Sequence, residues 1–135
     1  MYLLHLLLRS AGGVKTIFDK GRCFAVLDRE NDIPELPSGL FRKHRQLKDI
    51  DLQRNNINVI HDSVFRGASA AEVLNLERNN LERLEENVFA GLVNLKELHL
   101  ARNRLKLIDP KAFRALRQLE TLELKANKLR DLVFK

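Results

Sequence analysis

LKELHLARNRLKLIDPKAFRALRQ, the stretch from Leu95 to Gln118, decides the fold, because its pattern recurs every 24 residues along the chain. Five asparagines follow this spacing: Asn31, Asn55, Asn79, Asn103 and Asn127. Four phenylalanines follow it as well: Phe41, Phe65, Phe89 and Phe113. Self-similarity at a fixed period of this length predicts a solenoid, in which successive copies stack as coils.

Each copy has the form L-x-x-L-x-L-x-x-N-x-L. The copies are LKDIDLQRNNI (Leu47–Ile57), AEVLNLERNNL (Ala71–Leu81), LKELHLARNRL (Leu95–Leu105) and LETLELKANKL (Leu119–Leu129). This pattern resembles the leucine-rich repeat family over residues 33–132. The resemblance implies an α/β-type leucine-rich repeat solenoid, a curved right-handed coil. A parallel β-sheet would form its concave face, and short extended or 3₁₀ segments would form its convex face. The repeat length and the F-x-x-L ending at Phe89 and Phe113 are similar to the class found in extracellular receptors and matrix proteins.

The residues within one repeat predict how each coil is built. Leu98 and Leu100 flank His99, and this alternation predicts a short strand with one face directed inward. The asparagine then turns the chain off the strand. Once buried, its amide can bond backbone groups that no sheet ladder satisfies. Leu105 and Ile108 are expected to cover the core on the return path, and Phe113 is expected to close its outer side.

The repeat boundaries divide the chain into an irregular N-terminal part and a regular stack. The predicted segments are residues 1–22, an N-terminal signal-like or capping element; 23–46, a degenerate first repeat; 47–70, 71–94 and 95–118, repeats 1 to 3; and 119–135, a partial repeat 4 with no C-terminal cap. Met1–Leu8 is apolar but too short to span a membrane, which needs about 20 residues. A secretory signal and a strand or helix that covers the stack are both open. Leu122, Leu124, Leu129 and Leu132 should face water on one side at the last coil, which predicts self-association there or a fragment of a larger receptor.

The first repeat departs from the pattern. Counting back 24 residues from repeat 1 puts Cys23 at the position of Leu47 and Val26 at that of Ile50, but it puts Asp28 at a core position. Because a buried carboxylate is costly, this repeat should be distorted or open to solvent there. Cys23 is the single cysteine, so no intrachain disulfide can form, although extracellular members of the family usually carry cysteine clusters at both ends. Cys23 is either a remnant of such a cap or a small buried residue.

Charge and motifs argue against several function classes. The net charge is +6, but residues 47–132 carry 15 Lys and Arg against 13 Asp and Glu, so the stack has no broad basic face and nucleic acid binding is not expected. The four histidines lack metal-ligand spacing, and neither a nucleophile elbow nor a phosphate-binding loop is present. The sequence therefore predicts no metal, no cofactor and no enzyme activity.

The exposed strand positions form the candidate binding face, because in-register stacking places equivalent residues of successive repeats about 4.8 Å apart. The candidate ligand-binding residues on this concave face are Asp49, Asp51, Gln53, Val73, Asn75, Glu77, Glu97, His99, Thr121, Glu123 and Lys125. Apart from Ala101 and Ala126, Val73 is the one apolar residue expected to be exposed on the strands. Small apolar groups surrounded by polar residues are typical of interface centres.

An arginine precedes the asparagine in three repeats: Arg54, Arg78 and Arg102. Three like charges in adjacent coils should repel one another. They either splay and pair with acids such as Glu77, or they form a ridge that binds an acidic protein or a sulfated glycan.

Together these features predict a protein–protein interaction module of the extracellular receptor or matrix type, which binds a protein ligand on its concave sheet. The expected location is extracellular or at the cell surface. The alternatives are a cytoplasmic adaptor or scaffold on the same fold, and a truncated fragment of a larger receptor without its own ligand.

Overall fold

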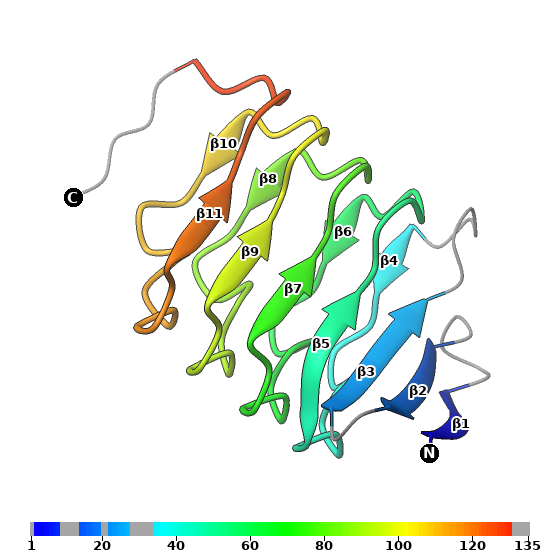
Figure 1. The fold of residues 1–135 in the computed structure, drawn as a ribbon. Helices are drawn as coiled ribbons and strands as arrows, with labels where there is room; N and C mark the ends of the chain where they lie inside the picture. The colour runs from blue at the N-terminus through cyan, green and yellow to red at the C-terminus, as the bar shows by residue number, and fades with distance from the viewer. Residues whose placement is uncertain (1, 9–13, 20–21, 28–33, 131–135) are drawn as a thin grey trace.

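A seven-stranded sheet runs along one side of the solenoid (Figure 1). The computed structural model describes residues 2–8, 14–19, 22–27 and 34–130. The strands of the sheet, in spatial order, are β1 (Tyr2–Leu8), β2 (Val14–Asp19), β3 (Arg22–Leu27), β5 (Leu47–Asp51), β7 (Val73–Asn75), β9 (Glu97–His99) and β11 (Thr121–Glu123). From β3 to β11 neighbouring strands are parallel, as the repeat pattern predicts.

Two-residue strands and turns form the opposite side of each coil. These outer strands are β4 (Glu35–Leu36), β6 (Val59–Ile60), β8 (Arg83–Leu84) and β10 (Leu107–Ile108). They pair as β4 with β6 and β8 with β10. Among the described residues there is no helix, and the outer turns are closed by hydrogen bonds between residues three apart, such as Arg42 N to Gly39 O. The predicted leucine-rich repeat solenoid is confirmed.

The register of the sheet keeps the 24-residue spacing from β5 onward. Leu74 lies between Ile50 and Leu98, and Leu122 follows Leu98 on the next strand. Leu74 and Leu98 are fully buried, whereas Glu97 and His99 on either side of Leu98 are partly exposed. The alternation within each strand therefore separates the core from the exposed face.

The register changes by one residue at the N-terminal side of the stack. Cys23 lies opposite Leu47, as counting back 24 residues predicts, but an irregularity follows, and Ala25 rather than Val26 lies opposite Ile50. Our prediction for Val26 was therefore wrong. β3 is also the last strand of an antiparallel β1–β2–β3 meander, so its pairing is constrained on both edges. The expectations for Asp28 and Leu132 fall outside the described residues.

A column of stacked phenylalanines links the coils inside the core. The ring centroids of Phe41 and Phe65 lie 5.7 Å apart, those of Phe65 and Phe89 6.3 Å, and those of Phe89 and Phe113 6.1 Å. The first three rings are fully buried, and Phe113 is partly buried. One ring per repeat thus fills the same space in each coil and fixes the distance to the next.

The asparagines connect adjacent coils through their side-chain amides. Asn79 Oδ1 accepts hydrogen bonds from the backbone N–H groups of Asn55 and Ile57, each at 3.0 Å. Asn79 Nδ2 donates to the carbonyls of Leu52 and Leu76, each at 3.0 Å. One buried side chain therefore satisfies backbone groups of its own coil and of the preceding one.

The same contacts recur in the next two repeats. Asn103 accepts from Leu81 N at 3.1 Å, and Asn127 accepts from Leu105 N at 3.0 Å. Asn55 Oδ1 has no hydrogen-bond partner among the described residues. By analogy with Asn79, the backbone N–H groups that would donate to Asn55 Oδ1 belong to residues 31 and 33, which the structure does not describe.

Replacing Asn79 with alanine should destabilise the fold, because the backbone amides of Asn55 and Ile57 lose their acceptor. The carbonyls of Leu52 and Leu76 also lose one of their two side-chain donors each. A single buried group left unsatisfied costs about 1–3 kcal/mol, so we expect the free energy of unfolding to fall by at least this amount. The neighbouring Asn80→Ala variant is the matched control, since the Asn80 side chain reaches only the exposed Asn56. Denaturant unfolding measures both variants, and equal midpoints for the two would contradict the role of Asn79.

Candidate functional site

Parallel stacking aligns the predicted binding residues in three columns on the outside of the sheet. The first column is Asp49, Val73, Glu97 and Thr121. The middle column is Asp51, Asn75, His99 and Glu123. Beyond the strands, the hydrogen-bond ladder of the sheet continues through the backbone N–H groups of Arg54, Arg78 and Arg102. Each of these groups donates to a carbonyl of the next coil. They align a third column of Gln53, Glu77, Ala101 and Lys125. We call the surface made by these columns the sheet face.

The structure brings all eleven predicted residues onto the sheet face, and all eleven are at least partly exposed. Ala101 differs from expectation, because it is fully buried. Its methyl group is too short to rise above its neighbours, whereas the longer side chains of Gln53 and Glu77 reach solvent. Within the strands themselves, Val73 is therefore the apolar group that the sheet face offers.

His99 lies between two carboxylates at the middle of the sheet face. Its Nδ1 is 3.0 Å from Glu123 Oε2 on the next strand, and its Nε2 is 3.3 Å from Glu97 Oε2 on its own strand. Burial lowers the pKa of His99, but the hydrogen bonds and charges of Glu123 and Glu97 outweigh it, so the pKa is raised. The hydrogen bond from His99 in turn lowers the pKa of Glu123. When His99 is protonated, both of its ring nitrogens can donate, one to each carboxylate.

Asp51 and Asn75, the first two residues of the middle column, form hydrogen bonds with the backbone just beyond their strands. Asp51 Oδ1 accepts from the backbone N–H of Gln53 at 3.2 Å, and Asn75 Oδ1 accepts from that of Glu77 at 3.0 Å. Side-chain bonds to the amide two residues on are typical of Asx turns. These two residues therefore end β5 and β7 while a part of each side chain still faces solvent.

The arginine ridge is partly neutralised. Arg78 Nε lies 3.7 Å and Arg102 Nε 3.8 Å from the same oxygen of Glu77, which matches the pairing alternative. Arg54 forms no ion pair among the residues that the structure describes. All three arginines have positive φ, between 57° and 58°, because the chain leaves the strand there in the left-handed conformation. Their positions are thus set by the turn into the asparagine.

Charge is unevenly distributed over the molecule. The eleven predicted residues include five carboxylates and one lysine, a net charge of −4 with His99 neutral, whereas the chain as a whole carries +6. The column beside them, Lys48, Glu72, Lys96 and Glu120, is neutral and contains a Lys96–Glu72 ion pair at 3.1 Å. Arg54, Arg78 and Arg102 adjoin the third column and add +3, which leaves this side of the sheet close to neutral.

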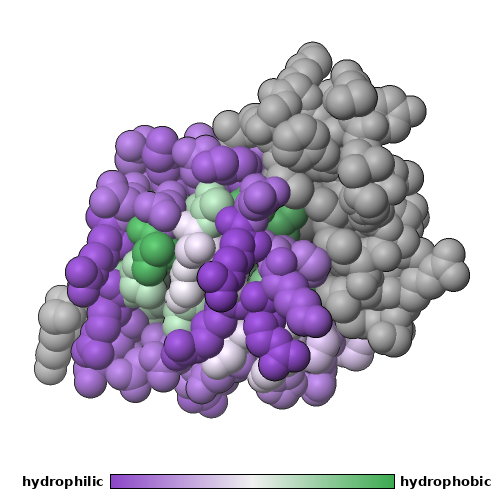
Figure 2. Space-filling view, turned by 90° about the horizontal axis from the view of Figure 1, so that it is seen from below, coloured by the Kyte–Doolittle hydropathy of each residue, from purple (hydrophilic) through white to green (hydrophobic). Residues whose placement is uncertain are grey.

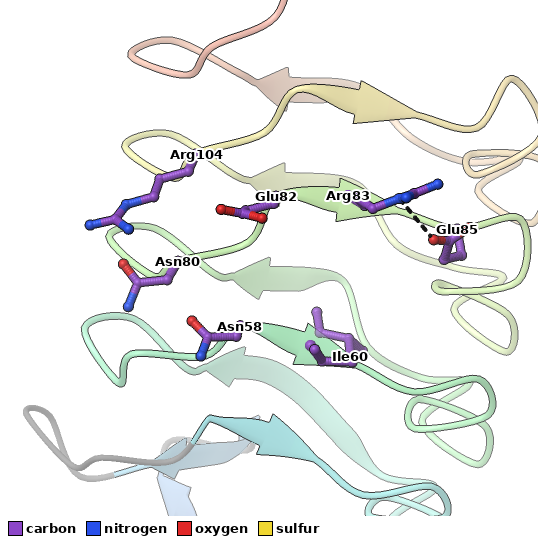
Figure 3. Close-up of a pocket in the computed structure, with 8 residues that line it drawn as sticks. Asn58, Ile60, Asn80, Glu82, Arg83, Glu85 and Arg104 are labelled. Atoms are coloured by element: carbon purple, nitrogen blue, oxygen red, sulfur yellow. Dashed lines mark ion pairs between the residues drawn. The ribbon is translucent and has the colours of Figure 1, made fainter.

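The outer side carries a hollow that the sequence did not indicate (Figure 3). It has a volume of about 450 Å³ and lies between β6 and β8, which belong to separate two-stranded sheets. Ile60 and Arg104 line it, together with Arg83 and Glu85, which form an ion pair at 3.3 Å (Figure 3). The residues of β6 and β8 fit the repeat pattern equally well, so no feature of the sequence predicts that these two outer strands are not paired with each other.

A second surface feature lies where the turns lead into the strands. Seen from that side, the described surface is mostly hydrophilic and has a small apolar group in its middle (Figure 2). The turns before β9 and β11 enclose a shallow hollow of about 330 Å³ lined in part by Ala90, Val93 and Ala115. Val93 is 46% exposed, and both cationic and anionic side chains surround it. The hollow is small and open.

The described residues also bear on metal binding and on membrane insertion. In that part of the chain, no group of three or more His, Cys, Asp or Glu side chains could hold a metal ion. The same residues contain no helix with the length and apolar character needed to cross a membrane.

A family model for the leucine rich repeat matches residues 27–79, 45–105 and 69–129. The chain belongs to the leucine-rich repeat family. No curated protein sequence matches it. Among solved structures, the Drosophila Toll–Spatzle complex is 33% identical over 71% of this leucine-rich repeat chain, with a TM-score of 0.69; its glycosylated form gives 33%, 71% and 0.68. A TLR13–ssRNA13 complex is 26% identical over 79% of the chain, with a TM-score of 0.59. The chain spans only 13% of the Toll chain and 18% of the TLR13 chain.

The His99 contacts predict a pH-dependent stability. Because its pKa is raised above 6.5, protonated His99 stabilises the fold fully below that pH, and this contribution is lost as the pH rises through the raised pKa. Glu123 has the opposite sign: its contribution is present above 4.5 and is lost as the pH falls through its lowered pKa. We therefore expect the stability difference between wild type and His99→Gln to be larger near about pH 6 than near about pH 9, on either side of the histidine range.

The control for this measurement is His44→Gln. Burial lowers the pKa of His44, so its contribution to stability should increase with pH, which is the opposite trend. Denaturant unfolding at both pH values gives the differences. If the stability difference between wild type and His99→Gln does not change with pH, or changes as for His44→Gln, the contacts of His99 with Glu97 and Glu123 do not stabilise the fold.

Proposed function

We propose that this chain is a protein-interaction module that binds a protein ligand across its sheet face. The observation that supports this most is the alignment of eleven side chains from four coils on one continuous surface with no element packed over it among the described residues. Each coil exposes only a few of these side chains, so a ligand that binds there must contact several repeats. Binding rather than catalysis is the role that such a surface favours.

The composition of the sheet face also suits a protein ligand. Val73 lies beside Asn75 on its own strand and opposite Glu97 on the next, so an apolar group is surrounded by polar ones. This arrangement is typical of the centres of protein interfaces. The Toll structure to which this chain is similar is a complex with the protein Spatzle, which fits the proposal.

The TLR13 structure contains a single-stranded RNA, so RNA is a second ligand class to weigh. Phosphate groups bind best to surfaces with excess Lys and Arg. The sheet face has five carboxylates against one lysine, and two of the three adjoining arginines already pair with Glu77, which argues against an RNA ligand at this site.

We propose an extracellular or cell-surface location, as the repeat class suggests, and the alternative is an adaptor or scaffold in the cytoplasm. Mass spectrometry of the natural protein distinguishes the two. Secreted material whose N-terminus has been cleaved within residues 1–22 would support the first location, and full-length protein in the cytosolic fraction would support the second.

Binding at the sheet face predicts a loss of the ligand when the first column is blocked. Val73→Arg with Thr121→Arg places two long cations beside Glu97, and we expect capture of the ligand to fall at least about tenfold. Folding should survive, because Val73 is partly exposed and Thr121 is exposed.

The matched control places the same charges on the outer side. Val59 and Leu107 are 42% and 57% exposed on β6 and β10, so Val59→Arg with Leu107→Arg also adds two cations without emptying the core. Immobilised wild type and both variants are used to capture proteins from extracellular material, and circular dichroism checks their folding. Loss of the captured protein in the outer-side variant alone would show that the sheet face is not the site.

A further inference from the structure

Positive charge is concentrated on the outer returns of the last two coils. The described residues of these returns, 104–118 and 127–130, contain one carboxylate, Asp109, and therefore have a net charge of +6. Their cationic residues are Arg104, Lys106, Lys111, Arg114, Arg117, Lys128 and Arg130. The equivalent residues of the two preceding coils, 56–70 and 80–94, carry 0 and −2. The near balance of charge over residues 47–132 therefore hides a basic surface at one end of the outer side.

The acids nearest to this surface do not cancel its charge. Asp131 lies outside the described residues, and counting it reduces the net charge to +5. Counting the return of residues 80–94 as well reduces it to +3. A polyanion that approaches this end of the outer side is therefore attracted to it.

Four of the cations form a compact array across the two coils. The backbone N–H of Lys128 donates to Leu105 O at 2.9 Å, which holds Lys128 beside Arg104 of the preceding coil. Two residues further on, Lys106 and Arg130 occupy the next outward repeat position of the same coils. We call Arg104, Lys106, Lys128 and Arg130 the outer basic array, and all four of its side chains are exposed.

The repeat does not require cations at these positions. The first position of the array is held by Asn56 and Asn80 in the earlier coils, and the second by Asn58 and Glu82. Like charges at equivalent positions of neighbouring strands repel one another and are destabilising. The outer basic array is therefore not explained by the stability of the fold.

The cations of the array are also available to a ligand. Within the part of the chain that the structure describes, none of the four forms an ion pair. By contrast, Lys111 and Arg114 lie within 3.9 Å of the same oxygen of Glu86, and two arginines of the ridge share Glu77. An anion that binds the array breaks no ion pair between described residues.

A hollow of about 520 Å³ lies within the outer basic array. Its described lining residues are Lys106, Leu107, Lys128 and Arg130, and no carboxylate is among them. Leu107 is 57% exposed, so the hollow has one apolar contact among three cations. An anionic group with an attached carbon skeleton matches both kinds of lining residue.

The arrangement of the array favours a polymer without bases. Successive coils repeat about every 4.8 Å, so the cations form a strip that suits several anionic groups in a row. From residue 104 to residue 130 the single aromatic side chain is Phe113, and it is stacked on Phe89 against the core. The surface therefore offers no aromatic platform on which nucleic acid bases could stack.

We propose that the outer basic array binds a sulfated polysaccharide, at a site separate from the sheet face. Sulfate groups bind the cations around the hollow, and a sugar ring contacts Leu107. Polymers of this class occur outside the cell, which fits the location proposed above. The site involves no residue of the sheet face, so it can be tested independently of the protein ligand proposed there.

The test uses a fluorescent heparin octasaccharide, whose binding is measured by fluorescence anisotropy at an ionic strength of about 0.15 M. Wild type should bind it. Lys106→Gln, Lys128→Gln and Arg130→Gln together should weaken this binding by at least about tenfold, because the hollow loses all three of its cations.

The matched control removes the same charge from the coil before β5. Arg42, Lys43 and Arg45 are exposed there, and replacing all three with glutamine should change binding by less than about threefold. The two variants have equal net charge, and the Debye length of about 8 Å at this ionic strength limits the influence of distant charges.

A variant that should bind more tightly makes the outcome independent of any loss of folding. Lys106 N donates to Glu82 O at 2.9 Å, so Glu82 is the neighbour of Lys106 in the preceding coil, and its side chain is exposed. Glu82→Lys extends the array by one coil and should tighten binding of the octasaccharide by at least about threefold. Thermal unfolding confirms that each variant is folded.

Four outcomes would overturn the proposal. The first is that wild type does not bind the octasaccharide. The second is that the variant of Arg42, Lys43 and Arg45 weakens binding as much as the array variant. The third is that Glu82→Lys does not tighten binding. The fourth is that an RNA oligonucleotide or a glutamate peptide of equal charge binds wild type more tightly than the octasaccharide does, which would assign the array to another class of polyanion.

Discussion

The fold depends on one buried amide per coil. A chain that leaves a strand and turns back over its own core exposes backbone N–H and C=O groups where no neighbouring strand can pair with them. Asn79 satisfies such groups in two coils at once, through an oxygen that accepts from the coil before and a nitrogen that donates to both. Aspartate would lack the donors and leucine would lack every polar atom, so the requirement selects asparagine. Strand spacing, phenylalanine stacking and the alignment of the sheet face all follow once adjacent coils are joined in this way.

The surface inherits its organisation from this core. Because successive coils are in register, each residue lies beside the residues at the same repeat position in the neighbouring coils. His99 therefore meets Glu123 although the two are 24 residues apart, and it meets Glu97 because both point outward from one strand. The left-handed turn places Arg78 and Arg102 on either side of Glu77 by the same rule. The sheet face and the arginine ridge are thus adjacent, and Glu77 joins them through its two ion pairs.

Sequence reasoning predicted the parts of the structure that repeat and missed those that do not. The strand positions and column neighbours follow from the period, since in-register stacking converts a spacing of 24 into contact. The pairing of Ala25 instead of Val26 with Ile50 could not be predicted, because it depends on an antiparallel meander outside the repeats. The burial of Ala101 could not be predicted either, because it depends on how far the longer side chains around it extend over its methyl group. The separation of β6 and β8 into two sheets has no counterpart in the sequence, because the residues of both strands fit the repeat pattern.

The irregularity between Cys23 and Phe24 shows where the chain can change its length. Downstream of it, the asparagine bonds join residues 22, 24 and 27 apart, and all of these separations change together if one residue is inserted between two ladder positions. Adding or deleting a whole unit of 24 residues leaves each of them intact. Upstream, the antiparallel strands contain no such ladder, and a single extra residue has already been absorbed at the junction. Duplication of a whole repeat therefore preserves every asparagine hydrogen bond of the stack, and the junction with the meander accommodates an offset of one residue.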